Sequence, residues 1–200
     1  MSHLDAVTPD TCAVLLAAGG GSRFAGTTHK LLAELQGVAV WRRSVQSVID
    51  AGFDSVIVVT GAVRLPVSAQ ERARLQLVHN PRWAQGQSTS LRVGVDAAAR
   101  GGARRVVVGL ADQPFISADT WRRIARADTA NPIVVATYDG VRGPNPVRLA
   151  SQVWPLLPNA GDVGARDVIR AHPQWVTEIE CVGSTADIDT LEDLERWTSY

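Results

Sequence analysis

Short runs of apolar residues recur along the chain, and their length and spacing predict buried β-strands. Most of the runs are apolar at nearly every position, which is typical of strands covered on both faces of a sheet. The last run alternates between apolar and polar residues, so we expect it to be an outer strand. The predicted strands are Cys12–Ala18, Val56–Thr60, Leu75–His79, Arg105–Ala111, Ile133–Tyr138 and Trp175–Val182.

Between these runs, apolar residues recur every three or four positions, which predicts amphipathic helices. Ser88 and Ser117 are expected to be N-caps, and Thr190 with Asp193 three residues later forms a capping pair. Three longer helices are expected at Val38–Ala51, Val67–Arg74 and Ser88–Arg100. Further helices are expected after Ser117, after the turn Gly161–Arg166 (ending before His172), and after Thr190.

The segment Asp139–Pro146 holds two glycines and two prolines and is therefore predicted to be a loop, followed by weaker structure over Val147–Leu157. Elsewhere strands and helices alternate, with no internal repeat or low-complexity linker. This order predicts a single domain over residues 1–200 with a doubly wound α/β fold and a mostly parallel sheet. In such folds, ligands bind beyond the carboxyl ends of the strands.

Composition narrows the classes of function. The chain has 200 residues, of which 46% are hydrophobic, and a formal net charge of zero, so a large basic surface for nucleic acid is not expected. No apolar stretch is long enough to span a membrane, and the polar segment Met1–Thr11 lacks the features of a signal peptide. Cys12 and Cys181 are expected to be buried apolar side chains rather than a disulfide or a metal pair. We therefore expect a cytoplasmic protein.

The first strand ends at three consecutive glycines, Gly19 to Gly21, and Ser22 and Arg23 follow them. Lys30, a few residues later, is the only lysine in a chain with 20 Lys and Arg residues. Glycines leave backbone amides uncovered, and a lysine supplies a compact charge to a single phosphate oxygen. This pattern favours a phosphate-binding loop, and the alternative is a flexible surface loop with an exposed lysine.

Two known phosphate motifs do not fit this loop. The dinucleotide fingerprint requires a third glycine where Phe24 stands, which disfavours a hydride-transferring dehydrogenase. The P-loop requires lysine directly after its second glycine, but Thr27 follows Gly26.

Acidic residues follow the later strands. Asp112 comes after the strand Arg105–Ala111, where it is either a Mg²⁺ ligand or the cap of a turn. Asp187 and Asp189 precede the last helix, where acids are also favoured by the helix dipole. Asp162 and Arg166 are four residues apart, so they form either a surface ion pair along a helix or a contact to a substrate.

Several of these segments, taken in order, resemble one family. They are Leu16 through Arg23 with Lys30, the segment Asn80–Gly94 with its Trp83, Gly86 and Ser90, the run Ala111–Pro114, the turn Gly161–Arg166, and Asp187–Thr190. Together they cover nearly the whole chain and are similar to the MobA-like nucleotidyltransferases. Within that family they most resemble the molybdenum cofactor cytidylyltransferases. The resemblance implies a Rossmann-like nucleotidyltransferase fold.

The resemblance also implies a role for each matching residue. The backbone of Ala17, Ala18, Gly19, Gly20 and Gly21, with Arg23, would hold the β- and γ-phosphates of a nucleotide, and Lys30 would lie at the α-phosphate. Gly86 and Ser90 would lie beside the base and ribose. Asp112 would bind Mg²⁺, with Asp189 preferred to Asp187 as the second acid. Asn145, Asp162 and Arg166 would face the acceptor. Lys30, Arg23 and Asp112 would be the catalytic residues.

The implied reaction is Mg²⁺-dependent transfer of a nucleoside monophosphate, CMP from CTP being favoured, to the phosphate of molybdopterin, with release of pyrophosphate. The implied partners are the nucleoside triphosphate, a molybdopterin-type acceptor, and a molybdoenzyme or its maturation chaperone. The alternatives are a guanylyltransferase that uses GTP, and a transferase acting on a sugar phosphate or alcohol phosphate. An alternative from another class is a carrier that binds a nucleotide or the molybdenum cofactor without chemistry.

Overall fold

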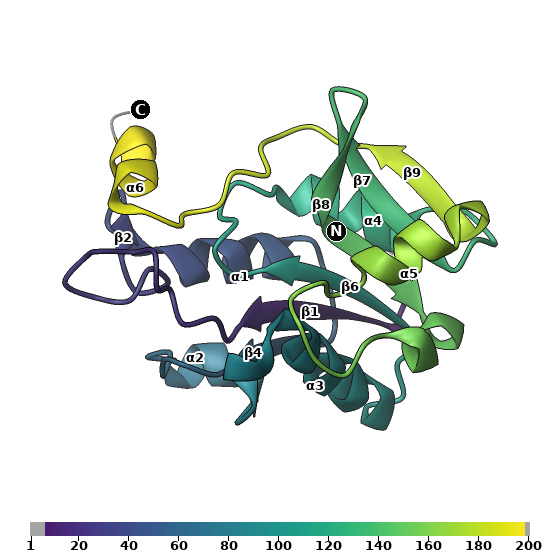
Figure 1. Cartoon of the computed structure of the whole chain (residues 1–200), viewed down its shortest axis with the longest axis horizontal. Coiled ribbons are helices and arrows are strands. Elements are labelled where there is room, and N and C mark those ends of the chain that lie inside the picture. Colours follow the sequence, from purple (N-terminus) through teal and green to yellow (C-terminus); the bar gives the residue numbers. More distant parts are fainter. Residues whose placement is uncertain (1–6, 199–200) are drawn as a thin grey trace.

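The computed structural model describes residues 7–198. Residues 1–6, which belong to the N-terminal segment Met1–Thr11 discussed above, lie outside the described residues, as do residues 199 and 200. One seven-stranded sheet, in the order β5-β4-β1-β6-β8-β7-β9, crosses the molecule (Figure 1). Only β8 runs antiparallel to its neighbours. The strands are β1 Thr11–Ala17, β4 Val56–Thr60, β5 Gln76–His79, β6 Arg105–Leu110, β7 Ile133–Tyr138, β8 Val141–Ala150 and β9 Val176–Glu180. A separate two-stranded ribbon consists of β2 Glu34–Leu35 and β3 Val38–Ala39.

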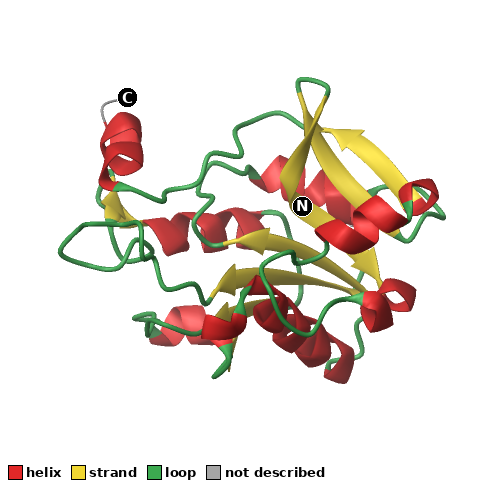
Figure 2. Ribbon diagram, in the orientation of Figure 1, coloured by secondary structure: helices red, strands yellow, loops and turns green. Residues whose placement is uncertain are grey.

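Helices cover both faces of the sheet (Figure 2). Helices α1 and α4 pack on one face, and α3 and α5 pack on the other. The short helix α6 lies at the end of the molecule that carries the β2–β3 ribbon (Figure 1). The α-helices are α1 Val40–Asp50, α2 Ala69–Arg72, α3 Gln87–Arg100, α4 Ala118–Arg126, α5 Arg166–Ala171 and α6 Leu191–Thr198. Short 3₁₀ helices occupy Trp83–Gln85, Ser151–Leu156 and Pro173–Trp175.

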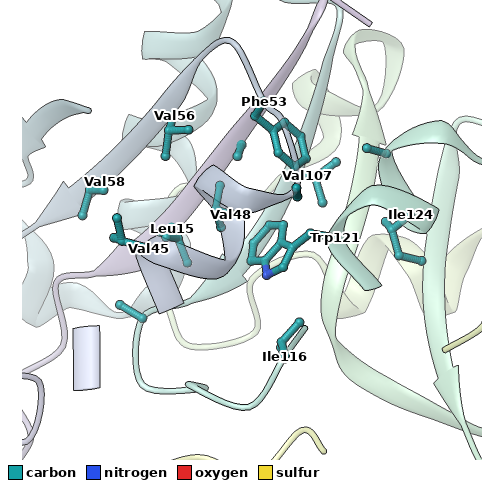
Figure 3. Packing of buried hydrophobic residues seen from close by; sticks show 14 of the residues in the cluster. Leu15, Val45, Val48, Phe53, Val56, Val58, Val107, Ile116, Trp121 and Ile124 are labelled. Atoms are coloured by element: carbon teal, nitrogen blue, oxygen red, sulfur yellow. The ribbon is translucent and has the colours of Figure 1, made fainter. Parts of the chain in front are cut away.

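The two faces of β1 belong to two different hydrophobic clusters because side chains alternate along a strand. Leu15 points to the cluster under α1 and α4, where Trp121 and Phe53 meet edge to face with their ring centres 6.2 Å apart (Figure 3). Val14 points to the opposite cluster, under α3. Because β1 is buried on both sides, its carboxyl end is a rigid base for the glycine loop that follows.

These observations confirm the predicted α/β fold with a doubly wound, mostly parallel sheet. Each predicted strand is present within one or two residues of its expected bounds, and Ser117 caps α4 by accepting from the amide of Thr120. Reciprocal bonds between Thr190 and Asp193 form the expected cap of α6. Among residues 7–198, no helix combines the length and the apolar character needed to cross a membrane.

The prediction of a loop over Asp139–Pro146 is wrong, because this segment forms the turn and first half of the hairpin β7–β8. Asp139 and Gly140 both have positive φ, as a tight hairpin turn requires. The two prolines are tolerated because β8 is irregular there: its pairing with β7 is interrupted between Arg142 and Val147, and its pairing with β6 begins only at Val147. The weaker structure expected after it is the second half of β8 and a 3₁₀ turn.

Candidate active site

The glycine loop leaves β1 at its carboxyl end and presents a row of uncommitted amides. Within residues 7–198, the backbone N–H groups of Gly19 through Arg23 donate to no protein acceptor, whereas the amide of Phe24 closes a turn on the carbonyl of Gly21. Consecutive free amides of this kind form a concave site for an anion. The loop borders a cavity of about 210 Å³, which is also lined by Arg23, Lys30, Asp112 and Asp189. The cavity therefore combines amide donors, two cations and two acids.

Lys30 joins segments that are far apart in the sequence. Its Nζ lies 2.5 Å from Oδ2 of Asp112 and 2.6 Å from Oδ1 of Asp189, and Nη2 of Arg23 lies 2.7 Å from the other oxygen of Asp189. The side chains of Lys30, Asp112 and Asp189 are only 11–16% exposed. The structure thus brings together the three predicted catalytic residues and the preferred second acid.

Hydrogen bonds to backbone groups hold the segments that carry Asp112 and Asp189 next to each other. Asp112 follows β6, and its own carbonyl accepts a hydrogen bond of 2.9 Å from the amide of Ile188, a fully buried residue. The carboxylate of Asp193 accepts from the amides of both Asp189 and Thr190. The cap of α6 therefore fixes the residue that carries the second acid, and the segment before α6 is bound to the end of β6.

The charges in this cluster stabilise one another. Burial lowers the pKa of Lys30, but the carboxylates of Asp112 and Asp189 outweigh burial and raise that pKa overall. Burial raises the pKa of Asp189, but the bond from Lys30 and the charge of Arg23 lower it overall. The pKa of Asp187 is raised, first by burial and also by the negative charge of Asp189. Asp189 is therefore the acid of this pair that stays ionised more readily.

The residues fit a hard divalent cation. Oδ1 of Asp112 is buried and has no hydrogen-bond partner within the described residues, although buried carboxylate oxygens are normally paired. Mg²⁺ is usually held by one or two carboxylates together with substrate phosphates, and Asp112 and Asp189 could supply these two carboxylates. Across residues 7–198, no group of three or more His, Cys, Asp or Glu side chains converges, so Asp187 as a ligand stays a prediction.

The predicted nucleotide-side residues lie where α3 begins. Ser90 is buried, and its Oγ accepts a bond of 2.9 Å from the side-chain Nδ2 of Asn80, a fully buried residue. Gly86 has a φ of 106°, and a Cβ there would lie 2.4 Å from the carbonyl carbon of Gly161. Gly86 is therefore required for the close crossing of two chain segments. Asn80 was not among the predicted site residues, although its place directly after β5 could have indicated it.

At this crossing the structure contradicts one sequence prediction and excludes one of two alternatives. Ser88 is not the N-cap of α3, which begins one residue earlier; its hydroxyl instead accepts from the amide of Gly164. Asp162 and Arg166 do not pair along a helix, because α5 begins only at Arg166. The carboxylate of Asp162 instead accepts a bond of 3.0 Å from the amide of Gln87, the first residue of α3.

The side chain of Asp162 thus caps the N-terminus of α3, although Asp162 belongs to a distant segment of the chain. We expect Asp162→Ala to lower the free energy of unfolding by about 1 kcal/mol, the usual cost of losing an N-cap side chain. Denaturant unfolding followed by circular dichroism measures this change. Asp162→Asn retains an acceptor oxygen and is the matched control. Equal stability of the alanine variant and the unchanged protein would argue against the cap.

The remaining predicted acceptor residues lie next to the glycine-loop cavity. Asn145 and Arg166 border a small cavity of about 40 Å³ that shares Leu16 with the larger one. The side-chain Nδ2 of Asn145 donates to Oε1 of Gln113, one residue beyond Asp112. The side chain of Arg166 makes no hydrogen bond or ion pair to any residue that the structure describes. Asn145 is therefore linked to the segment of Asp112, and the side chain of Arg166 is available to a ligand in the smaller cavity.

Comparison with known proteins shows what this chain is similar to. Nicotine blue oxidoreductase of Paenarthrobacter nicotinovorans is 31% identical over 205 residues, which covers 96% of this chain and 98% of that protein. The purine catabolism protein PucB of Bacillus subtilis (strain 168) is 29% identical over 202 residues, which covers 94% and 96% of the two chains.

Solved structures of a further protein, Rv0371c, are also similar to this chain. Rv0371c from Mycobacterium tuberculosis H37Rv superposes with a TM-score of 0.77 at 28% identity, over 96% of this chain and all of that one. A structure of Rv0371c in complex with manganese gives a TM-score of 0.71 at 27% identity, over 94% of this chain and 98% of that one. The sequence also matches the MobA-like NTP transferase domain over residues 13–176. Because that match extends over most of the sequence, this chain belongs to the MobA-like NTP transferase domain family.

Proposed function

We propose that the protein transfers a nucleoside monophosphate, CMP from CTP being favoured, to the phosphate of a molybdopterin-type acceptor. The observation that carries this proposal is the contact of Lys30 with both Asp112 and Asp189, at the edge of a cavity lined by free glycine amides. Those amides and the two cations suit a triphosphate, and the two acids suit a divalent metal. The manganese complex of Rv0371c supports a divalent metal.

In this proposal an oxygen of the acceptor phosphate attacks the α-phosphorus of the nucleotide, and pyrophosphate leaves. A phosphate monoester is already ionised at neutral pH, so the protein needs no strong general base. The glycine amides and Arg23 hold the β- and γ-phosphates, and Lys30 stabilises the charge that develops at the α-phosphate. Asp112 and Asp189 would hold Mg²⁺, which neutralises phosphate charge when bound.

The acceptor would approach from the side of Asn145 and Arg166. Both border the cavity beside the glycine loop, and Asn145 is bonded to Gln113, next to the first acid. Arg166 offers a cation without a protein partner among the described residues. An attacking group bound there would lie beside the proposed α-phosphate position, so catalysis would consist mainly of positioning and charge neutralisation.

The proposal is tested by pyrophosphate release with Mg²⁺ and molybdenum-loaded molybdopterin, run separately with CTP, GTP, ATP and UTP. We expect release with CTP alone. Release with GTP would retain the mechanism and replace the preferred base. If nucleotides bind tightly and none releases pyrophosphate, the protein is a carrier or uses a different acceptor, such as a sugar phosphate.

A second candidate function is that of an oxidoreductase, which is favoured by the 31% identity to nicotine blue oxidoreductase. The same preparation should then be tested for reduction of nicotine blue by an added reductant. Reduction of that compound without pyrophosphate release would favour this second function over transfer.

A further inference from the structure

His29 directly precedes Lys30 and has no role in the proposed reaction, but its imidazole ring contacts the glycine loop. Its Nε2 lies 3.0 Å from the carbonyl oxygen of Gly19, and its Nδ1 lies 3.2 Å from the backbone nitrogen of Leu31. A carbonyl can only accept and a backbone amide can only donate. The ring therefore carries its proton on Nε2 and leaves a lone pair on Nδ1, so it is neutral.

The imidazole touches the glycine loop at a second point. A Cβ placed on Gly21, whose φ is 62°, would lie 3.1 Å from Nε2 of His29. The ring thus packs against Gly21 while it is bonded to Gly19. His29 itself is anchored, because its carbonyl accepts bonds of 2.8 Å and 3.1 Å from the amides of Leu32 and Ala33.

These contacts matter because the loop has little else to fix it. Three glycines in a row have more backbone freedom in the free chain than any other residues, and ordering them costs conformational entropy. Their amides have no protein acceptor within residues 7–198. The bond from His29 fixes the plane of the peptide between Gly19 and Gly20. Because the C=O and N–H of a trans peptide point in opposite directions, it also turns the N–H of Gly20 away from the ring.

We propose that His29 is a positioning residue that holds the triple-glycine loop in the conformation that receives the phosphates of the nucleotide. This inference rests on the proposed function, because it assumes that the loop binds a triphosphate. The ring does not touch the reacting atoms; it acts by ordering the loop before the nucleotide arrives. Burial lowers the pKa of His29, which agrees with the neutral ring that both bonds require.

Two conservative variants separate the two bonds. Glutamine places its amide nitrogen near the position of Nε2 and can still donate to Gly19, whereas asparagine reaches only the position of Nδ1. We expect His29→Ala and His29→Asn to raise the KM and Kd for the nucleotide about 10-fold, as for the loss of one hydrogen bond, with kcat within about 3-fold. His29→Gln should stay within about 3-fold of the unchanged protein in KM, because it keeps the bond to the loop.

Amide ¹⁵N relaxation of the nucleotide-free protein gives a readout that is independent of activity. We expect the order parameters of Gly19 to Gly21 to fall from about 0.85 to below about 0.6 in the alanine and asparagine variants, and to be retained in the glutamine variant. His172→Ala is the matched control, because His172 stacks on Trp175 far along the chain and should leave the loop unchanged.

The two proposals fail in different ways. If the unchanged protein neither binds nucleotides nor releases pyrophosphate, the proposed function is wrong, while the relaxation data still decide whether His29 orders the loop. If the unchanged protein is active and His29→Ala has the same KM and the same order parameters, the role of His29 is wrong. Equal behaviour of the glutamine and asparagine variants would also overturn it.

Discussion

Replacing Asp112 by alanine is expected to lower the turnover number for pyrophosphate release about 100-fold or more, by analogy with the loss of one group that stabilises a transition state. The carboxylate has two tasks in the proposed reaction. One oxygen lies 2.5 Å from Nζ of Lys30, and the other is buried without a hydrogen-bond partner in the described part of the chain. The variant loses both the orientation of Lys30 and the metal ligand.

The loss of the metal-binding carboxylate can be measured separately. Calorimetric titration of nucleotide-free protein with Mn²⁺ should show weaker binding in Asp112→Ala, and Asp112→Asn should behave similarly because it keeps the shape but not the charge. Asp119→Ala is a matched control, since the exposed carboxylate of Asp119 pairs, among the described residues, with Arg122 on α4 and lies outside the candidate site. Near-native turnover in a folded Asp112→Ala protein would remove Asp112 from the mechanism.

Replacing Lys30 by alanine is also expected to lower turnover about 100-fold or more, but it should change metal affinity in the opposite direction. In this structure the ammonium contacts both acids, at 2.5 and 2.6 Å. A divalent ion held by the same two carboxylates would compete with the ammonium for their negative charge. Without the lysine, two largely buried carboxylates lack this counter-ion, so we expect Mn²⁺ to bind about 10-fold more tightly, or about 1.4 kcal/mol.

The same variant should depend on metal for its stability. Two neighbouring buried acids repel each other, so Lys30→Ala should unfold at a lower temperature than the unchanged protein without metal and recover much of the difference with Mn²⁺. Lys30→Met, which keeps the length of the side chain, separates the loss of charge from the loss of packing. Arg122→Ala is the control for removing a cation elsewhere. Weaker Mn²⁺ binding in both Lys30 variants would show that the lysine supports the metal site instead of competing with it.

Much of the fold could be predicted from sequence because the strands are apolar on both faces. The run that forms β1 cannot be exposed on either side, so its bounds follow from composition alone. β8 could not be found in this way. Residues 141–146 of this strand contain a glycine and two prolines, and the pairing with β7 is interrupted there, so local sequence preferences indicate a loop. The hairpin turn and the neighbouring strands nevertheless hold the segment in the sheet.

The candidate site likewise has one part that could be predicted from the sequence and one part that could not. The proximity of Lys30 and Asp112 could be predicted, because both lie beyond the ends of neighbouring parallel strands. The position of Asp189 depends on the cap of α6 and on the bond between Ile188 and Asp112, which join residues far apart in the chain. The contacts of His29 and the cap from Asp162 have no local signal, since each depends on a loop crossing that only the folded chain reveals.

The reversed direction of β8 has a consequence for engineering this protein. An antiparallel strand delivers its first residues, not its last, to the edge where the parallel strands end, so Asn145 arrives beside Gln113. The register with β6 is set further along, from Val147 to Ala150. A set of substitutions at Pro144, which lines the cavity beside Asn145, would therefore vary the proposed acceptor side alone. The glycine loop, Lys30 and both acids come from other segments and would remain as they are.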